Sequence, residues 1–590
     1  MNPFSPLFCS IGLATLGAAI AFPVMAQQPL SIVYPPPNHE TTADRIFLIG
    51  TAAADGEVTV NGETIERSPA GHFAPSFPLQ IGENRFVIRY QNQELQWVVT
   101  RKSTQPILPQ GIDFAKGSLL PVDPIARMPG ESICFEAIAP ADSTVSVQLA
   151  NRSVTLLPQS QSVALPANNA VLTGNNQPET QTIAGLYQGC TSFNTPGNLG
   201  TPVFQLELNG TVRTQAGSGA IEILSSDRIE VAEVIVEGGV ARTGPGTDYS
   251  RLTPLPKGTQ AAITAKEGEW LRLDYGAWIK ASEVQVFPTG TPPRSLIRSV
   301  RASHGSPWTE VFFPLQVPVP VSIVQDTDTL TLTLHNTTAQ TDTIAFNDNP
   351  IVSWMDWQQV SGDLQYTFHF KSQQQWGYKL RYDGTTLVLS LRHPPKLLGD
   401  VQSLAGVTVL LDPGHGSDAD LGAVGPNGYP EKHVALRISQ LLRDRLLARG
   451  ATVVMTREGD EDILPGARAD RIAKVEPTIA LSLHYNALPD SGDAMNTAGI
   501  GTFWYQPQAH DLATFLYNYL VEDLNRPAYG VFWGNLALTR PAVTPSVLLE
   551  LGFMINPVEF EWIVDPAEQD KLADSLAEGI TQWIHSRVES

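Results

Sequence analysis

The chain has 590 residues and 42% of them are hydrophobic, so it is too apolar to be wholly disordered and too long for one hydrophobic core. Its 38 Lys and Arg against 59 Asp and Glu give a net charge of −21, which disfavours a protein that tracks nucleic-acid phosphates. Only 16% of the residues are charged, which favours β-modules over long charged helices. We therefore expect about four or five domains, several of them all-β.

Residues 1–26 have the pattern of a secretory signal peptide. An uncharged apolar stretch that contains Cys9 ends at Val24-Met25-Ala26, the small-x-Ala form that a signal peptidase cleaves. The start has no Lys or Arg and the stretch is long enough to span a bilayer, so an uncleaved anchor is the alternative. No later stretch is apolar over a comparable length. We expect cleavage near Ala26, export to the periplasm or cell envelope, and no stable membrane insertion afterwards.

Two cysteines, Cys134 and Cys190, remain in the exported chain. In an oxidising compartment they are a candidate disulfide, but the sequence does not give their separation, so two buried free thiols are the alternative. Three cysteines in the whole chain are too few for a Cys-rich zinc site. Any metal must therefore be held by His and carboxylates.

Alternating apolar and polar residues predict two β-modules at the start of the exported chain. Residues 30–104 contain Asn61-Gly62 between two such runs, a hairpin signal because both residues tolerate positive φ, and the pattern resembles a small immunoglobulin-like module. Residues 110–226 predict a β-rich module of unknown role. Within it, the polar stretch 166–182 predicts a long loop.

Residues 228–287 resemble a bacterial SH3-type barrel, through VARTGPG, the LPKG turn and the EWL and AWI strands. Such barrels often bind cell-wall peptides, whereas a spacer barrel with Trp270 and Trp278 in its core is the alternative. Residues 288–297 are Pro-rich and predict a linker. Residues 298–396 resemble an AMIN-type β-module, through DTLTLTLHN and GTTLVLSLRHPP, and such modules direct amidases to the envelope.

Residues 405–587 combine short apolar strands with helical periodicity. The predicted strands are VTVLLD, TVVMT, TIALSLH, GTFWY and SVLLEL, and the predicted helices include 431–449, 510–524 and 566–584. This alternation predicts an α/β domain with a mainly parallel sheet that is covered on both faces.

Four titratable residues fall at the ends of these elements, where open parallel sheets bind ligands. His415 follows the first strand, His484 ends another, Glu431 starts a helix and Glu550 lies near the end of the last strand. Two His and one carboxylate form a common catalytic zinc set, and a second carboxylate can move protons. Taken singly, the His residues could be turn residues and Glu431 a helix-dipole carboxylate. A carboxylate inside VLLEL, however, is costly to bury without a purpose.

The same stretch resembles the catalytic domain of zinc-dependent N-acetylmuramoyl-L-alanine amidases of the AmiC-like family along its whole length. The matching motifs are LDPGHG, GAVGPNGYPEK, LLARGATVVMTREGD, LPGARADRIA, LSLHYNA and PSVLLELGFMINPVE. The resemblance implies that His415, Glu431 and His484 bind Zn²⁺ and that Glu550 is catalytic. One departure is His433, where the family usually has Asp.

Two further residues, Asn486 and Arg468, match family positions near the site. The resemblance implies that they bind substrate, and the alternatives are a strand cap and a helix salt bridge. The reaction that it implies is hydrolysis of the amide between N-acetylmuramic acid and L-alanine in peptidoglycan.

Two rival hypotheses remain, a zinc carboxypeptidase that acts on stem peptides and a wall-binding scaffold without activity. The sequence contains no H-E-x-x-H and no G-x-S-x-G motif, which disfavours standard zincin proteases and serine hydrolases.

Some relatives carry a long helical insertion after the His-x-Asn-Ala segment that plugs the zinc site. Here only residues 488–499, rich in Pro, Gly, Asp and Asn, precede the next predicted strand, and they predict a loop. A helix needs about 12–15 residues to be even marginally stable alone, so this loop is too short for a plug. We therefore expect activity without an activator protein, unless another module supplies the block.

Overall fold

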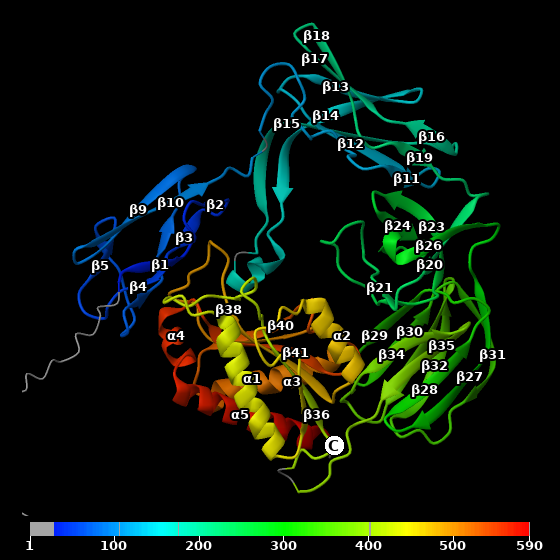
Figure 1. The fold of residues 1–590 in the computed structure, drawn as a ribbon. Coiled ribbons are helices and arrows are strands. Elements are labelled where there is room, and N and C mark those ends of the chain that lie inside the picture. The colour runs from blue at the N-terminus through cyan, green and yellow to red at the C-terminus, as the bar shows by residue number, and fades with distance from the viewer. Residues whose placement is uncertain (1–28, 106, 175, 401–402, 589–590) are drawn as a thin grey trace, which may run out of the picture.

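The computed structural model describes residues 29–105, 107–174, 176–400 and 403–588 (Figure 1). The predicted signal peptide, residues 1–26, lies outside the described residues. Within the described part of the chain, every helix is too short or too polar to cross a membrane. Strands make up nearly all of the regular structure before residue 400, and the five α-helices of the described residues follow it. The predicted order, β-modules first and an α/β domain last, is confirmed.

The first module, residues 31–101, is built from short strands around one core. Its strands are β1 (Ser31–Tyr34), β2 (His39–Thr41), β3 (Arg45–Phe47), β4 (Ile49–Thr51), β5 (Val58–Val60), β6 (Glu63–Thr64), β7 (His72–Phe73), β8 (Ser76–Pro78), β9 (Gly82–Tyr90) and β10 (Gln93–Arg101). They form the sheets β2-β10-β9-β5-β6 and β1-β4-β7 and the pair β3-β8. The predicted hairpin is confirmed, because Asn61 and Gly62 join the paired strands β5 and β6 with φ of 52° and 89°.

The second module, residues 125–223, contains a long hairpin where the sequence predicted a loop. Its elements are β11 (Ile125–Arg127), β12 (Ser132–Ile138), β13 (Thr144–Leu149), β14 (Arg152–Ala164), the 3₁₀-helix η1 (Asn168–Thr173), β15 (Glu179–Ser192), β16 (Gly197–Gly200), β17 (Val203–Leu208), β18 (Thr211–Ala216) and β19 (Ile221–Ile223). The last paired residues of β14 and β15 are Ala164 and Glu179, so the loop that joins the two strands is shorter than predicted. This loop contains η1. Cys134 and Cys190 lie opposite each other on β12 and β15 and form a disulfide.

The third module, residues 229–289, shares a sheet with the second. Its elements are β20 (Ile229–Val234), β21 (Gly238–Gly239), β22 (Leu255–Pro256), β23 (Gln260–Glu267), β24 (Trp270–Leu273), β25 (Trp278–Lys280), η2 (Ala281–Glu283) and β26 (Val284–Thr289). Strand β11 pairs with β19 on one side and β23 on the other, so hydrogen bonds cross the boundary predicted at residues 226–228. Trp270 and Trp278 are buried and belong to one small apolar cluster.

The fourth module, residues 295–392, is a sandwich of two mainly antiparallel sheets around one core. Its strands are β27 (Ser295–Gly305), β28 (Trp308–Pro314), β29 (Val321–Gln325), β30 (Thr329–Leu334), β31 (Thr337–Ala345), β32 (Val352–Val360), β33 (Asp363–Phe370), β34 (Tyr378–Asp383) and β35 (Thr386–Arg392). Because β26 ends at Thr289 and β27 begins at Ser295, only part of the predicted linker 288–297 lacks strand structure.

The C-terminal domain, residues 405–588, has a six-stranded sheet in the order β37-β36-β38-β41-β39-β40. Its elements are β36 (Thr408–Pro413), α1 (Glu431–Ala448), β37 (Thr452–Met455), α2 (Pro465–Val475), β38 (Ile479–Asn486), β39 (Ile500–Trp504), η3 (Pro507–Ala509), α3 (His510–Asp523), β40 (Ala528–Trp533), β41 (Ser546–Phe553), α4 (Pro557–Ile563) and α5 (Pro566–Val588). Strands β37, β36, β38 and β41 run parallel, and β39 and β40 run the other way. The prediction of a mainly parallel sheet is confirmed, whereas β40 was not predicted.

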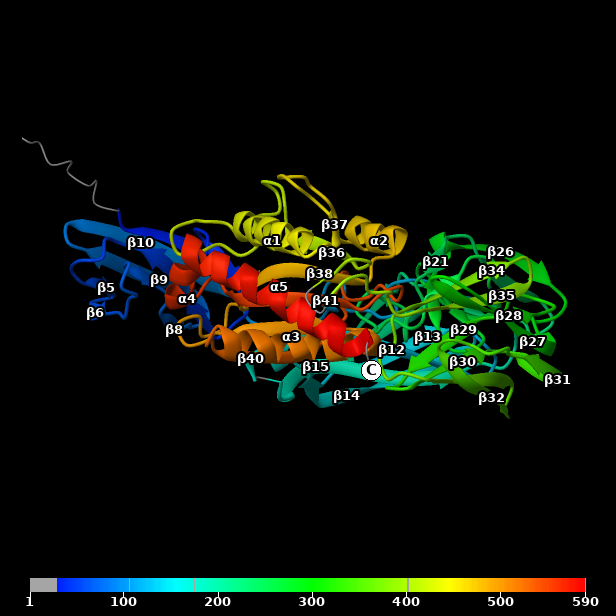
Figure 2. The ribbon, with the colours of Figure 1, turned by 90° about the horizontal axis from the view of Figure 1, so that it is seen from below.

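Helices α1, α5 and α3 cover one face of this sheet, with α5 between the other two (Figure 2). Buried residues at helical spacing on α1, such as Val434, Ile438 and Leu442, place that helix on the core. The opposite face is covered by α2 and by Trp308 of the fourth module, which packs on the cluster of Leu410 and Ile472. An upstream module therefore completes the second layer.

The fourth module and the C-terminal domain are bound together by buried contacts. Trp376 is 3% exposed, belongs to the core of the C-terminal domain and lies 5.5 Å from Trp583, measured between ring centroids. Arg392 donates hydrogen bonds to the carbonyl oxygens of Glu476 and Val543 at 2.7 and 3.1 Å. The two parts share a core and form one structural unit.

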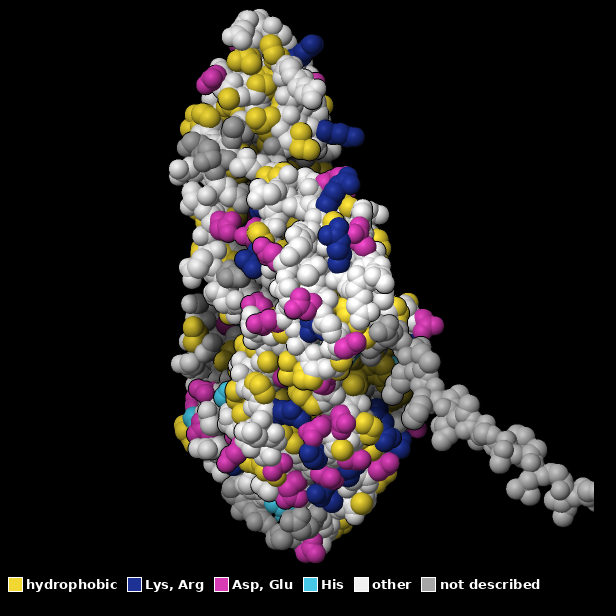
Figure 3. Space-filling model, turned by 90° about the vertical axis from the view of Figure 1, so that its left-hand side faces the viewer, with side chains coloured by type: hydrophobic (Ala, Val, Ile, Leu, Met, Phe, Trp, Pro, Cys, Tyr) yellow, Lys and Arg dark blue, Asp and Glu magenta, His cyan; other side chains and the backbone are white. Residues whose placement is uncertain are grey.

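Charged side chains of both signs lie side by side over the lower half of the face in Figure 3, and the upper part of that face has few. Its upper end is formed by the second module, where all six residues of β18 are exposed. This face has no continuous basic surface, in agreement with the acidic composition.

The shared core predicts that Trp376→Ala destabilises the protein. We expect the free energy of unfolding to fall by about 3–5 kcal/mol, because removing a buried Trp leaves a cavity. Trp354→Ala is the matched control, since Trp354 is 55% exposed, and it should cost less than about 1.5 kcal/mol. Urea unfolding followed by circular dichroism measures both. Equal midpoints for the two variants would contradict a shared core.

Candidate metal centre

The four residues that the sequence singled out meet at the carboxyl edge of the parallel strands. His415 follows β36 by two residues, His484 lies near the end of β38, and Glu550 pairs with His484 across β38 and β41. Glu431 is the first residue of α1. The predicted convergence of these side chains is therefore present in the structure.

The imidazoles of His415 and His484 face the two oxygens of one carboxylate. Glu431 Oε2 lies 3.2 Å from His415 Nε2, and Glu431 Oε1 lies 3.1 Å from His484 Nδ1. One nitrogen or oxygen from each of the three residues lies within 4.8 Å of the others, a spacing that suits ligands of one metal ion. His433 is not in this group, and its Nε2 lies 3.8 Å from Asp460.

Glycines let the backbone approach this group closely. A Cβ on Gly414 would lie 2.4 Å from the His484 ring, and a Cβ on Gly422 would lie 2.5 Å from both Glu431 Oε2 and the His415 ring. His415 itself adopts a left-handed φ of 60°, which a non-glycine residue adopts only when its surroundings hold it. The loop thus forms a tight cradle around the three side chains.

Asp420 orients His415. Its Oδ1 lies 2.6 Å from His415 Nδ1, and because a carboxylate only accepts, Nδ1 carries the proton and Nε2 is turned toward Glu431. Burial lowers the pKa of His415, but hydrogen bonds and negative charge from Glu431 and Asp420 outweigh burial and raise that pKa to about 9. Burial raises the pKa of Glu431, but the two imidazoles outweigh it, so Glu431 is ionised.

Glu550 has a different environment from Glu431. Its Oε2 is buried and has no hydrogen-bond partner among the described residues. Burial raises the pKa of Glu550, and so does the negative charge of Glu431. His484 and His415 lower that pKa, and the result is a pKa of about 8. Two neighbouring carboxylates with pKa values pushed apart are the arrangement expected for one ligand and one proton carrier.

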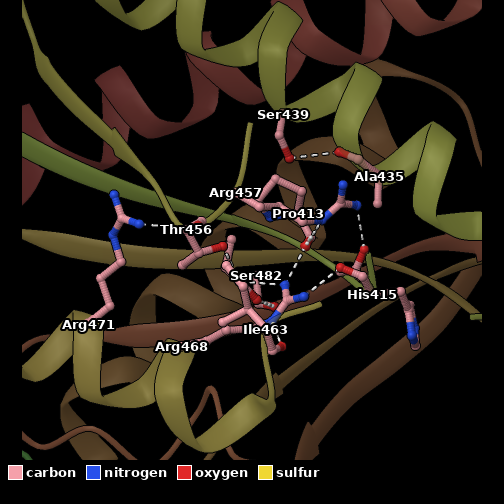
Figure 4. A network of polar contacts seen from close by, with 12 residues as sticks. Pro413, His415, Ala435, Ser439, Thr456, Arg457, Ile463, Arg468, Arg471 and Ser482 are labelled. Carbon is pink, nitrogen blue, oxygen red and sulfur yellow. Dashed lines mark hydrogen bonds and ion pairs between the residues drawn. The ribbon is translucent and has the colours of Figure 1, made fainter. Parts of the chain in front are cut away.

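Two buried arginines hold the loop that carries His415 (Figure 4). Arg468 donates to Asp412 Oδ1 at 3.0 Å, to the Pro413 carbonyl at 2.6 Å and to the His415 carbonyl. Arg457 donates to the carbonyls of Pro413 and Gly414 at 3.0 and 2.8 Å. Three consecutive carbonyls are therefore fixed by two guanidinium groups.

This network gives Arg468 a structural role, and the substrate-binding role that the resemblance implies stays a prediction. Its side chain is 3% exposed and the hydrogen bonds of its guanidinium run to Asp412 and to backbone carbonyls, so it lies beneath the loop and not at the surface of the cleft. The salt bridge that was the alternative is present, with Asp412 at 3.0 Å.

Asn486 is placed differently, at the end of β38. Its Oδ1 accepts a hydrogen bond from the Ala487 N–H at 2.8 Å. Its Nδ2 is buried and has no partner among the described residues.

Sequence reasoning missed Asp412, Asp420 and Tyr529, which all surround the site. Asp420 carried a signal, because an acidic residue shortly after a His ligand often orients its ring. Tyr529 carried none, because its strand β40 was not predicted. Its ring lies 4.9 Å from Phe553, which ends the strand of Glu550.

Comparison with known proteins supports one family for the C-terminal domain. Residues 409–582 match the family described as N-acetylmuramoyl-L-alanine amidase. The germination-specific N-acetylmuramoyl-L-alanine amidase of Bacillus subtilis is 32% identical over 199 residues, which cover 30% of this chain and 81% of that protein. The probable cell wall amidase LytH of Staphylococcus epidermidis is 30% identical over 184 residues, covering 31% of this chain and 60% of that protein.

Two solved structures cover the same part of the chain. The amidase AmiC2 of Nostoc punctiforme is 26% identical with a TM-score of 0.29, covering 30% of this chain and 97% of that structure. An N-acetylmuramoyl-L-alanine amidase of Clostridium difficile 630 is 27% identical with a TM-score of 0.30, covering 31% and 100%. The match to the Bacillus subtilis amidase covers 81% of that protein, and the family match covers nearly the whole C-terminal domain of this chain. Through that domain, this chain belongs to the N-acetylmuramoyl-L-alanine amidase family.

Proposed function

We propose that the protein is a zinc-dependent amidase that hydrolyses the bond between N-acetylmuramic acid and L-alanine in peptidoglycan, outside the cytoplasm, for wall remodelling or cell separation. One observation carries the proposal. The carboxylate of Glu431 lies between the two imidazoles at the carboxyl edge of the sheet, and Glu550 stands beside His484 on the next strand.

The donor set supports zinc as the metal. Two imidazole nitrogens and one carboxylate oxygen are a usual catalytic zinc set, which leaves a fourth position for water or substrate. A side chain at Gly414 or Gly422 would press on the proposed ligands, so glycine at both positions leaves room for the three side chains. When bound, zinc supplies a Lewis acid that polarises the amide carbonyl and lowers the pKa of the attacking water.

Glu550 is the proposed proton carrier. Its unpartnered Oε2 is free to accept the proton of the attacking water and to pass that proton to the departing amine of L-alanine. Without a metal the pKa of Glu550 is about 8, and a zinc ion held by the neighbouring His–Glu group would lower that pKa, so the carboxylate would be ionised and could act as a base at neutral pH.

Other residues act on this group or on the substrate. Asp420 fixes the ring of His415, and Arg457 and Arg468 hold the carbonyls of its loop, so these three are positioning residues. Asn486 retains a free amide donor near the end of β38, and we assign it to substrate carbonyls.

The upstream modules are assigned to localisation. We propose that the immunoglobulin-like (30–104), SH3-type (228–287) and AMIN-like (298–396) modules hold the catalytic domain at the wall by shape-specific contacts, since a chain of net charge −21 is repelled by an anionic polymer. A periplasmic or envelope location follows from the predicted signal peptide, and peptidoglycan is the proposed partner.

Product analysis tests the reaction and separates it from a carboxypeptidase and from an inactive scaffold. The full chain should release intact stem peptides with a new L-alanine amine from purified peptidoglycan, and a chelator should abolish that release until Zn²⁺ is added back. Mass spectrometry identifies the products. Release of a terminal amino acid would favour the carboxypeptidase, and no release with zinc bound would favour the scaffold.

Glu550→Ala should lower kcat by about 10²–10⁴-fold, the usual cost of removing a general acid–base, while zinc stays bound. His415→Ala should lose both zinc and activity, because a ligand is removed. Elemental analysis together with amine release measures the two effects. Zinc loss in Glu550→Ala combined with retention in His484→Ala would reverse the assignment.

Asp420→Asn should weaken zinc binding by about 10–100-fold, because the His415 ring loses the partner that fixes it. Asp418→Asn is the matched control in the same loop, since the Asp418 side chain is fully exposed and contacts Lys432 instead of a ligand. Competition with a chromogenic chelator gives both affinities. Similar losses in the two variants would point to a general effect of loop charge.

A further inference from the structure

The long hairpin of the second module reaches the C-terminal domain. Strands β14 and β15 run from the upper part of Figure 1 down to the catalytic sheet, and Figure 2 shows the hairpin along the β40 side of that sheet. The hairpin tip, described at residues 165–174 and 176–178, is fastened there, because the Tyr529 hydroxyl donates a 2.7 Å hydrogen bond to the Leu172 carbonyl. Leu172 is partly buried, while Val171 beside it is 55% exposed.

Tyr529 brings the hairpin tip to the edge of the candidate metal centre. Gly501 pairs with Glu550 across β39 and β41, and a Cβ on Gly501 would lie 3.0 Å from the Tyr529 ring and 3.7 Å from Glu550 Cβ. The Tyr529 ring and the Glu550 side chain therefore flank the same space on one face of the sheet. The hairpin tip is therefore fastened, through Tyr529, on the Glu550 side of the candidate metal centre.

The first module packs on the loop that follows the strand of His484. Phe47, Ile49 and Ala74 of that module form one buried cluster with Ala494, Phe553 and Ile555, against which Tyr529 also packs. The side chain of His39 lies 3.0 Å from Asp490, and Ser76 donates to the Gly492 carbonyl at 3.2 Å. The loop 488–499 contains no helix, as predicted, but two upstream modules contact the catalytic domain close to the site, the second at Tyr529 and the first at this loop.

We propose that the hairpin tip is a specificity-determining wall of the substrate cleft, which admits soluble muropeptides and hinders intact cross-linked peptidoglycan. The inference rests on the proposed function. In the polymer the N-acetylmuramic acid that carries the scissile amide has glycan on both sides, and the stem peptide is cross-linked to another strand, so the substrate must extend past the site in several directions. A monomeric muropeptide has no such extension. A wall beside Glu550 therefore discriminates between the two by size.

The tip can be removed without disturbing the ladder that supports it. Ala164 and Glu179 are a paired position of β14 and β15, so replacing residues 165–178 by Asn-Gly joins them through a two-residue hairpin turn. Tyr529→Phe is the smaller change, which removes the hydrogen bond and keeps the ring. Tyr519→Phe is its matched control, since Tyr519 packs against Gly579 of α5 and not at the cleft.

The readout is the ratio of kcat/KM on intact peptidoglycan to kcat/KM on a monomeric muropeptide, measured with the full chain. Tyr529→Phe should raise this ratio by about threefold to tenfold, the effect of losing one neutral hydrogen bond that fastens the tip. The shortened hairpin should raise it further, and Tyr519→Phe should leave it unchanged.

An unchanged or lower ratio in the shortened hairpin, with wild-type zinc content and unfolding midpoint, would overturn the inference. If the shortened variant misfolds, the ratio measured for Tyr529→Phe decides whether the inference holds. If the wild type hydrolyses neither substrate, the proposed function fails instead. Amide hydrogen exchange then tests the wall separately, since Tyr529→Phe should speed exchange in residues 168–173, and equal exchange would show that the contact does not hold the tip.

Discussion

The buried carboxylate of Glu431 is the constraint around which the catalytic edge is built. The residue is 2% exposed, and an ionised carboxylate at such a position is stable only if its oxygens are fully partnered. Its partners are His415, His484 and the N–H groups of Ala423 and Tyr485 at 2.8 and 2.9 Å. One side chain thus ties together the loop after β36, the start of α1 and the end of β38, and a bound cation would meet a site whose geometry is already fixed.

The site was predictable because it depends on local rules that the sequence displays. Buried parallel strands are recognisable in the sequence as short apolar runs, and the carboxyl ends of such strands lie at one edge of the sheet. His415 and His484 lie at these strand ends. The inward position of Arg468 was not predictable, for an equally physical reason. A motif places a residue near a site but does not show toward which side of a loop its side chain points. Here the guanidinium of Arg468 points inward because it donates hydrogen bonds to the carbonyls of Pro413 and His415.

The features that were missed depend on partners far away in the chain. The polar residues 179–182 lack the alternation of apolar and polar side chains that predicts a half-buried strand. They belong to β15 because their backbone pairs with the backbone of β14. Trp376, in the polar run QQQWGY, has no periodic neighbours that would predict its burial against Trp583. The boundary near residue 227 follows from where the SH3-type resemblance begins, and that resemblance carries no information about the pairing of β11 with β23.

Tyr529 joins three parts of the molecule that composition alone would treat as independent. Its ring packs on the cluster shared by the first module and the C-terminal domain, its hydroxyl holds the second module's hairpin, and it flanks the space beside Glu550. Because close-packed interiors transmit strain, the packing of the first module on loop 488–499 is coupled to the position of the Tyr529 ring. The surroundings of Glu550 therefore depend on the first and second modules, although the residues proposed for the chemistry all belong to the last domain.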